Sequence, residues 1–150
     1  MRLRIPPLVQ VLFFSSAMLA ISRYAVKASF GFASINEFAL FCLAGGVVMI
    51  SSGIVIFRKA KTTVTPLHPD KASTLVTMSI YQYTRNPMYF GLLLILFSFG
   101  LYLQNLVSMF VLPIYVWFIR KYQIIPEEEA LHKLFGQDYI NYQDRVRRWI

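Results

Sequence analysis

The sequence predicts an all-α integral membrane protein with about four transmembrane helices, followed by C-terminal helices in the cytoplasm or at the membrane interface. The chain has 150 residues, which suits a single domain. Hydrophobic residues make up 57% of it, and its mean hydropathy is +0.53. Charged residues make up only 15%, whereas soluble domains have about 25%. The apolar residues also gather in four runs, which predicts membrane helices.

A transmembrane helix needs about 20 mainly apolar residues. The first two runs are long enough, and the last two are shorter and separated only by Gln104-Asn105, which predicts a helical hairpin. We expect helices at about 5–27, 36–57, 87–103 and 106–125, a connection at 58–86 and a helical region at 126–150. The alternative for the first run is a cleaved signal peptide, but no small-x-small cleavage site follows it.

The distribution of basic residues predicts the orientation. With four spans, every Lys and Arg except Arg23 and Lys27 falls on one side of the membrane. The positive-inside rule then places both termini and the 58–86 connection in the cytoplasm, as in a bacterial inner membrane protein. A net charge of +8 would suggest nucleic acid binding in a soluble protein. Here it is explained by membrane orientation, so no nucleic acid partner is expected.

The boundary before the third run, YTRNPMYFG at 83–91, has an unusual composition. Pro87 suits the first turn of a helix, and Asn86 can cap that helix. Gly91 allows another group to approach the backbone closely. Tyr and Arg are also common anchors at a membrane interface, which is the simpler explanation of these two residue types. That explanation does not account for Asn, Pro and Gly together.

The last helical region begins with Pro126 and three acids, Glu127, Glu128 and Glu129. Carboxylates at the edge of a membrane can bind ribose hydroxyls or a cation, and a helix N-terminus there offers free N–H groups. The alternative is structural: acids stabilise a helix N-terminus, and a basic amphipathic helix binds anionic lipid. Cys42 is expected to be a packing residue, and no cluster of metal ligands is present in the sequence.

These two segments together resemble the isoprenylcysteine carboxyl methyltransferase and phospholipid methyltransferase superfamily. The resemblance covers about 57–150. The first block matches at Tyr81, Arg85, Asn86, Pro87, Tyr89 and Gly91, and the second at Glu127, Glu128, Leu131, Phe135, Gly136, Tyr139 and Tyr142. Two departures are present. Ser79 replaces a frequent Gly, and Asn86 replaces the His of eukaryotic members, which excludes a proton-transfer role there.

The resemblance implies a membrane methyltransferase that uses S-adenosylmethionine and methylates a lipophilic small molecule or lipid-modified substrate entering from the bilayer. It implies catalytic roles for Arg85 and Glu128. It implies cofactor binding by Tyr81, Asn86, Pro87, Tyr89, Gly91, Glu127 and Glu128. Arg85 would bind either the cofactor carboxylate or an anionic acceptor. The alternative is a non-catalytic membrane protein of the same fold that binds lipid or a protein partner.

Overall fold

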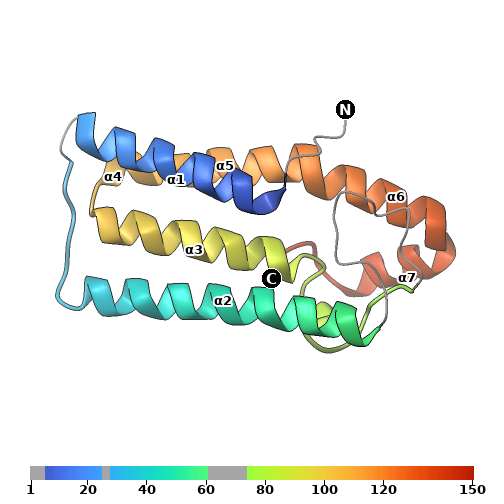
Figure 1. Cartoon of the computed structure of the whole chain (residues 1–150). Helices are drawn as coiled ribbons and strands as arrows, with labels where there is room; N and C mark the ends of the chain where they lie inside the picture. The colour runs from blue at the N-terminus through green and yellow to red at the C-terminus, as the bar shows by residue number, and fades with distance from the viewer. Residues whose placement is uncertain (1–5, 25–27, 61–73) are drawn as a thin grey trace.

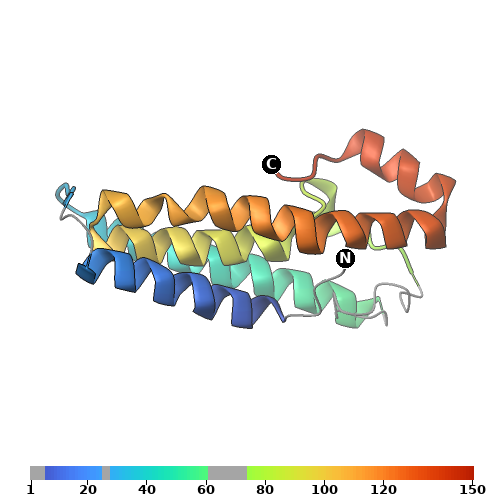
Figure 2. The ribbon, with the colours of Figure 1, turned by 90° about the horizontal axis from the view of Figure 1, so that it is seen from above.

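The computed structural model describes residues 6–24, 28–60 and 74–150, and within these ranges the regular elements are helices. The chain order is α1 (Pro7–Tyr24), α2 (Ile35–Lys59), the 3₁₀ helix η2 (Ser79–Gln82), α3 (Pro87–Leu103), α4 (Leu106–Met109), α5 (Val111–Ile119), the π-helix η3 (Arg120–Ile124), α6 (Ile125–Phe135) and α7 (Gln137–Arg145). The long helices lie side by side in a bundle, and α6 and α7 extend beyond one end of it (Figures 1 and 2).

Helix α3 is the central element of the bundle, as its composition requires. It carries no charged residue, and it contacts α1, α2, α4 and α5. The main core contains the fully buried side chains Met18, Leu96, Tyr115 and Ile119. Phe14 packs edge-on against Tyr115, with ring centroids 5.2 Å apart. The helix that starts at Pro87 is therefore held firmly by its neighbours.

The backbones of helices α2 and α3 lie close together at Gly46 and Gly91. A Cβ atom on Gly46 would lie 2.6 Å from the Gly91 carbonyl oxygen, and one on Gly91 would lie 2.7 Å from the Gly46 carbonyl oxygen. Small residues at such a crossing let two helix backbones meet, a common arrangement in membrane helix pairs. This crossing gives Gly91 a role in helix packing.

The substitution Gly46→Ala is therefore expected to destabilise the protein by about 1–3 kcal/mol, because its methyl group would overlap the Gly91 backbone. Gly45→Ala is the matched control, since its Cβ would meet nothing closer than 3.9 Å. That change should be neutral or stabilising by up to about 1 kcal/mol through helix propensity. Thermal unfolding in detergent measures both. Equal midpoints for the two variants would show that the crossing is not tightly packed.

The fourth apolar run differs from the single expected helix at 106–125. It contains a break at Phe110, and the chain then continues from α5 through the π turn η3 directly into α6 (Figure 2). Prolines explain both features, because a helical Pro lacks an N–H and clashes with the carbonyl four residues earlier. Pro113 accounts for the break, and the wider π turn accommodates Pro126. The expected free helix N-terminus before Glu127 is thus wrong, since the helix does not start there.

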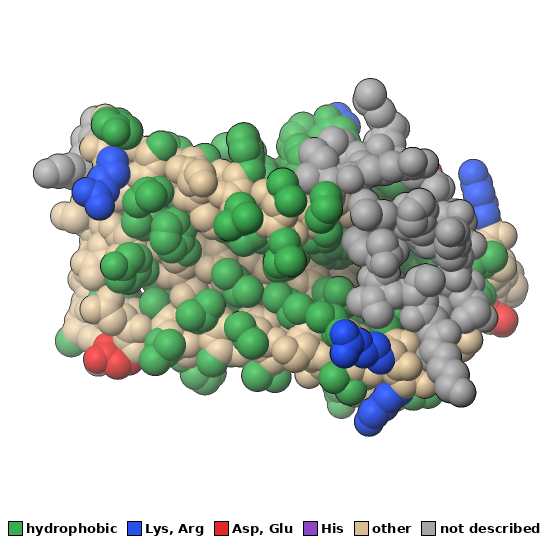
Figure 3. All heavy atoms as spheres, viewed as in Figure 1, with side chains coloured by type: hydrophobic (Ala, Val, Ile, Leu, Met, Phe, Trp, Pro, Cys, Tyr) green, Lys and Arg blue, Asp and Glu red, His purple; other side chains and the backbone are tan. Residues whose placement is uncertain are grey.

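Two of the described helices, α1 and α2, are long and apolar enough to cross a membrane, and α3 is a shorter apolar helix. Apolar side chains cover the bundle face seen in Figure 3, and charged side chains gather toward its two ends. Leu8, Leu12 and Phe13 on α1 are each more than 60% exposed. The all-helical architecture and this apolar surface agree with a membrane protein.

One end of the bundle brings together segments that are distant in the sequence. The start of α1, the end of α2, the start of α3 and the α6–α7 pair all lie there (Figure 1). The expected connection at 58–86 is described only in part. The first two residues of this connection belong to α2, and its last part contains η2. Residues 61–73 lie outside the described residues. The two ends of the helix expected at 5–27 also lie outside them.

Candidate functional site

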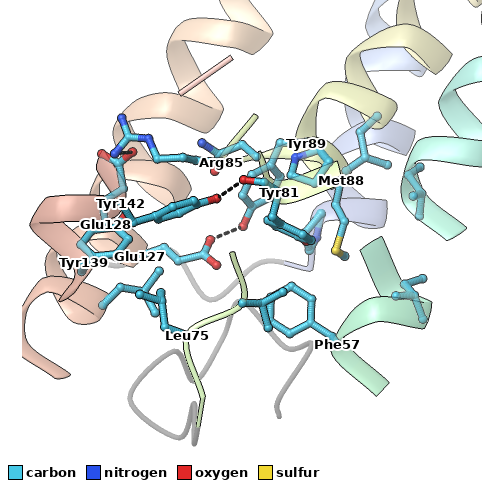
Figure 4. A pocket seen from close by; sticks show the side chains of 18 of the residues that line it. Phe57, Leu75, Tyr81, Arg85, Met88, Tyr89, Glu127, Glu128, Tyr139 and Tyr142 are labelled. Atoms are coloured by element: carbon cyan, nitrogen blue, oxygen red, sulfur yellow. Dashed lines mark hydrogen bonds and ion pairs between the residues drawn. The ribbon is translucent and has the colours of Figure 1, made fainter. Parts of the chain in front are cut away.

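A cavity of about 260 Å³ opens at this end of the bundle. Its polar part is formed by Tyr81, Arg85, Asn86, Tyr89, Glu127, Glu128, Tyr139 and Tyr142. Its apolar part is formed by Pro7, Leu8, Ile50, Ile54, Phe57, Met88, Leu92 and Leu131. Figure 4 shows the acids and Arg85 beside the α6–α7 ribbon, and Phe57 and Met88 beside α2 and α3. The cavity thus joins a charged wall to an apolar wall.

Asn86 and Pro87 set the start of α3 at the edge of the cavity. Pro87 occupies the first turn, as expected, and Asn86 occupies the N-cap position. The Asn86 side chain does not cap the helix, however, so that expectation is wrong. Its Nδ2 instead donates to the carbonyl oxygen of Arg148 at 2.9 Å. The amide of Asn86 donates to Thr84 Oγ1 at 3.2 Å, which fixes the turn.

Glu128 is the centre of an ion-pair cluster. Arg148 donates to both of its carboxylate oxygens, with Nε–Oε1 at 3.0 Å and Nη2–Oε2 at 2.6 Å. Arg85 Nη1 lies 3.4 Å from Glu128 Oε1. Arg85 Nε and Nη1 are buried and have no hydrogen-bond partner in the structure. Because unpaired buried donors are costly, Arg85 is well placed to receive an anionic or carbonyl group.

Glu127 faces the other side of the polar part. Its Oε2 accepts a hydrogen bond of 2.9 Å from the Tyr89 hydroxyl (Figure 4). Burial raises the pKa of Glu127 to about 7, the Tyr89 hydrogen bond acts in the opposite direction, and the nearby Glu128 carboxylate raises it further. The two acids therefore have different environments. The Glu128 carboxylate is paired with two arginines, whereas the Glu127 carboxylate is desolvated beside Tyr89.

The elevated Glu127 pKa predicts a pH-dependent stability. A native pKa of about 7, above the ordinary 4.5, means that the folded state binds this proton more tightly than the unfolded state. The stability that this proton contributes to the folded state is fully present below pH 4.5, the ordinary pKa of the acid. It is lost as the pH rises to the native pKa of about 7. We expect the free energy of unfolding to fall by about 3 kcal/mol across this range.

Glu127→Gln should remove most of this slope in chemical or thermal unfolding measured at several pH values. Glu129→Gln is the matched control, because Glu129 is an exposed acid on the same helix. It should leave the slope unchanged. The same slope in wild type and Glu127→Gln would refute the assignment to Glu127.

Tyrosines complete the wall between the two acids. The Tyr142 hydroxyl donates to the carbonyl oxygen of Tyr81 at 2.7 Å, which ties α7 to η2. Tyr81 packs edge-on against Phe57 with ring centroids 5.4 Å apart. Burial raises the pKa of Tyr139 to about 12, so its hydroxyl is neutral near pH 7. These rings supply a firm, uncharged surface around the carboxylates.

The structure brings most of the predicted site residues to the cavity. Tyr81, Arg85, Asn86, Pro87, Tyr89, Glu127 and Glu128 all line it. Gly91 does not line the cavity and packs against Gly46 instead, so the expectation that it approaches a ligand is corrected. Sequence reasoning missed Arg148, because it considered the basic residues near the C-terminus only as part of an amphipathic helix that binds anionic lipid. An Arg at the end of a segment rich in Tyr and Trp was the only available signal.

Comparisons with known proteins identify the family of the chain. A family model described as phospholipid methyltransferase matches residues 35–138. The chain therefore belongs to this family of membrane methyltransferases. No solved structure matches the chain.

Individual relatives extend the comparison. An uncharacterized protein of Haemophilus influenzae is 40% identical over 63 residues, which is 42% of this chain and 100% of that protein. Protein-S-isoprenylcysteine O-methyltransferase B of Arabidopsis thaliana is 28% identical over 112 residues, 75% of this chain and 57% of the relative. The corresponding enzyme of Schizosaccharomyces pombe is 29% identical over 118 residues, 79% of this chain and 50% of the relative. The chain thus spans about half the length of the named methyltransferases that it matches.

Proposed function

We propose that the protein transfers a methyl group from S-adenosylmethionine to a lipophilic acceptor. One observation carries the proposal. A single cavity joins the Arg85–Glu127–Glu128 group to an apolar wall formed by α1, α2 and α3. A polar cofactor and an apolar acceptor could meet there. The family and the names of the plant and yeast relatives, both isoprenylcysteine O-methyltransferases, support the same reaction type.

The polar part fits the functional groups of the cofactor. Arg85 has two buried nitrogens that make no hydrogen bond, although Nη1 is also ion-paired with Glu128, and such donors suit a carboxylate. Glu127 and Glu128 suit ribose hydroxyls or an ammonium group. Tyr81 and Tyr89 would line the cofactor, and the Asn86-Pro87 backbone would border it. S-adenosylmethionine brings an already activated methyl group, so the protein chiefly needs to align the reactants and exclude water.

The apolar part fits the hydrophobic portion of an acceptor. Pro7 and Leu8 of α1 line it together with Ile50, Ile54 and Phe57 of α2. An acceptor tail would lie here, with its reactive atom toward the polar part. Arg85 would also suit an anionic acceptor, because its buried donors border the same cavity.

We further propose that the described bundle spans a bacterial inner membrane four times, with α1, α2, α3 and the α4–α5 pair as the spans. The site would then face the cytoplasm, with both chain ends on that side. The gathering of the α1 start, the α2 end and α6–α7 at one end of the bundle supports this orientation.

Calorimetry with purified protein in nanodiscs tests the proposal. S-adenosylmethionine and its demethylated product S-adenosylhomocysteine should bind at one site, and adenosine alone should bind more weakly, because it lacks the groups that Arg85 and the acids would hold. Folded protein that binds neither compound at millimolar concentration would overturn the enzyme assignment and would favour a non-catalytic protein of the same fold.

A further inference from the structure

The residues after α7 form a strap, defined here as 146–150, that crosses the start of α3. The amide of Arg85 donates to the Arg147 carbonyl oxygen at 3.0 Å. The Arg148 carbonyl oxygen accepts from Asn86 Nδ2 at 2.9 Å and from Thr84 Oγ1 at 3.3 Å. The strap is therefore fastened by hydrogen bonds to the same segment that carries the first motif.

Apolar contacts fasten the strap as well. Val146 is buried in a small cluster with Tyr139 and Tyr142, two residues of the tyrosine wall. Trp149, on the other side of Arg148, packs against the main core cluster. Arg148 thus lies between two residues that are held by apolar contacts. Its backbone position therefore does not depend on the ion pair that its side chain makes with Glu128.

The side chain of Arg148 uses this fixed position to hold Glu128. The two parallel bonds, at 3.0 and 2.6 Å, define the plane of the carboxylate. Paired bonds of this kind add geometric specificity that a single charge contact lacks. Oε1 is approached by both Arg148 and Arg85, whereas Oε2 accepts from Arg148 and keeps a second acceptor position, so Glu128 can still accept a hydrogen bond from a ligand in the cavity.

An ordinary surface ion pair would not explain the arrangement. Exposed pairs contribute little, because the side chains are mobile and the charges are screened. Here the Glu128 side chain is only 11% exposed and Arg148 is 29% exposed, and the backbone of Arg148 is itself bonded. Arg85, at 3.4 Å from Glu128, contacts the same carboxylate from the cavity wall. Arg148 therefore orients the acid from behind while the cavity side stays available.

We propose that Arg148 is a positioning residue for cofactor binding: it holds the Glu128 carboxylate in the orientation that receives the ligand. This inference rests on the proposed function of the cavity as an S-adenosylmethionine site. It gives the strap a role in the site and makes Arg148 act through Glu128 rather than by contact with the ligand.

A double-mutant cycle tests the proposal. Binding of S-adenosylhomocysteine is measured by calorimetry for wild type, Arg148→Gln, Glu128→Gln and the double variant, all in nanodiscs. Arg148→Gln should weaken binding about tenfold, the size expected for losing an oriented charged hydrogen bond. The double variant should bind no more weakly than Glu128→Gln alone, because residues that act as a unit are not additive. Arg148→Lys should recover part of the affinity, since it keeps the charge but not the paired geometry.

The control is Arg145→Gln, which removes the same charge from an exposed position whose Nε donates to the Asn141 carbonyl oxygen of its own helix. It should bind like wild type. Additive losses in the double variant, or wild-type affinity in Arg148→Gln, would overturn the proposal. If Arg148→Gln does not fold, Arg148→Lys and its combination with Glu128→Gln complete the same cycle. A wild-type protein that does not bind the ligand would instead refute the proposed function, so the two failures are distinguishable.

Discussion

Replacement of Arg85 by Met is expected to weaken S-adenosylmethionine binding about a hundredfold, because each lost hydrogen bond to a charged group is worth about 1.5–3 kcal/mol. Arg85 lines the cavity, and its buried Nε and Nη1 make no hydrogen bond in the structure. Met keeps much of the apolar stem but offers no donor. Glu128 would retain its bonds to Arg148, so the effect should fall on the ligand more than on the fold.

Calorimetry with Arg85→Met and Arg85→Lys measures this effect, and Arg58→Met is the control, because Arg58 is exposed in the last turn of α2 on the same end of the bundle. The control should bind normally. Arg85→Met that binds the cofactor normally but no longer transfers methyl groups would move Arg85 to the acceptor side of the reaction. Normal cofactor binding together with normal methyl transfer would show that Arg85 has no role in the site.

The second large effect is expected at the apolar wall. Ile54→Trp should reduce methyl transfer more than about tenfold, since a large ring in a cavity of this size removes space for an acceptor tail. Cofactor affinity should stay within about twofold, because Ile54 belongs to the apolar part of the cavity and offers no group to a polar cofactor. The effect is a loss of transfer without a loss of cofactor binding.

Val55→Trp is the matched control, because Val55 is the next residue on α2 and is 47% exposed on the outer face. Transfer is followed with labelled cofactor and extracted membrane lipid, and cofactor binding is followed by calorimetry. Equal transfer by the two Trp variants would show that the apolar part of the cavity does not hold the acceptor.

Local signals predicted the helices better than they predicted the joints between them. Apolar runs and Pro87 indicated where α3 begins, and the structure begins it there. The joint before Glu127 could not be predicted, because Pro126 is equally compatible with a helix start and with a π turn inside a continuous helix. Contacts with the rest of the bundle decide between these, and they are not local properties of the sequence.

The site residues, like the helix joints, were predictable only as far as local sequence patterns determine them. The motif segments predicted which residues gather at the cavity, since Arg85, Glu127 and Glu128 all line it. The partners of these residues depend on long-range folding. Asn86 bonds to a carbonyl 62 positions away instead of capping its helix, and Arg148 reaches Glu128 only because the strap returns to α3. A glycine such as Gly91 can serve a ligand or a helix crossing, and only the position of Gly46 decides between them.

Methyl transfer from labelled S-adenosylmethionine tests the central claim most directly. Purified protein in proteoliposomes is incubated with lipid extract from native membranes, and label is counted in the organic phase and traced to a product. Wild type should label an extractable lipophilic product, and Glu128→Gln should lose most of that activity while remaining folded. Wild-type protein that is folded and binds the cofactor, yet transfers no label to any component of the extract, would contradict the account.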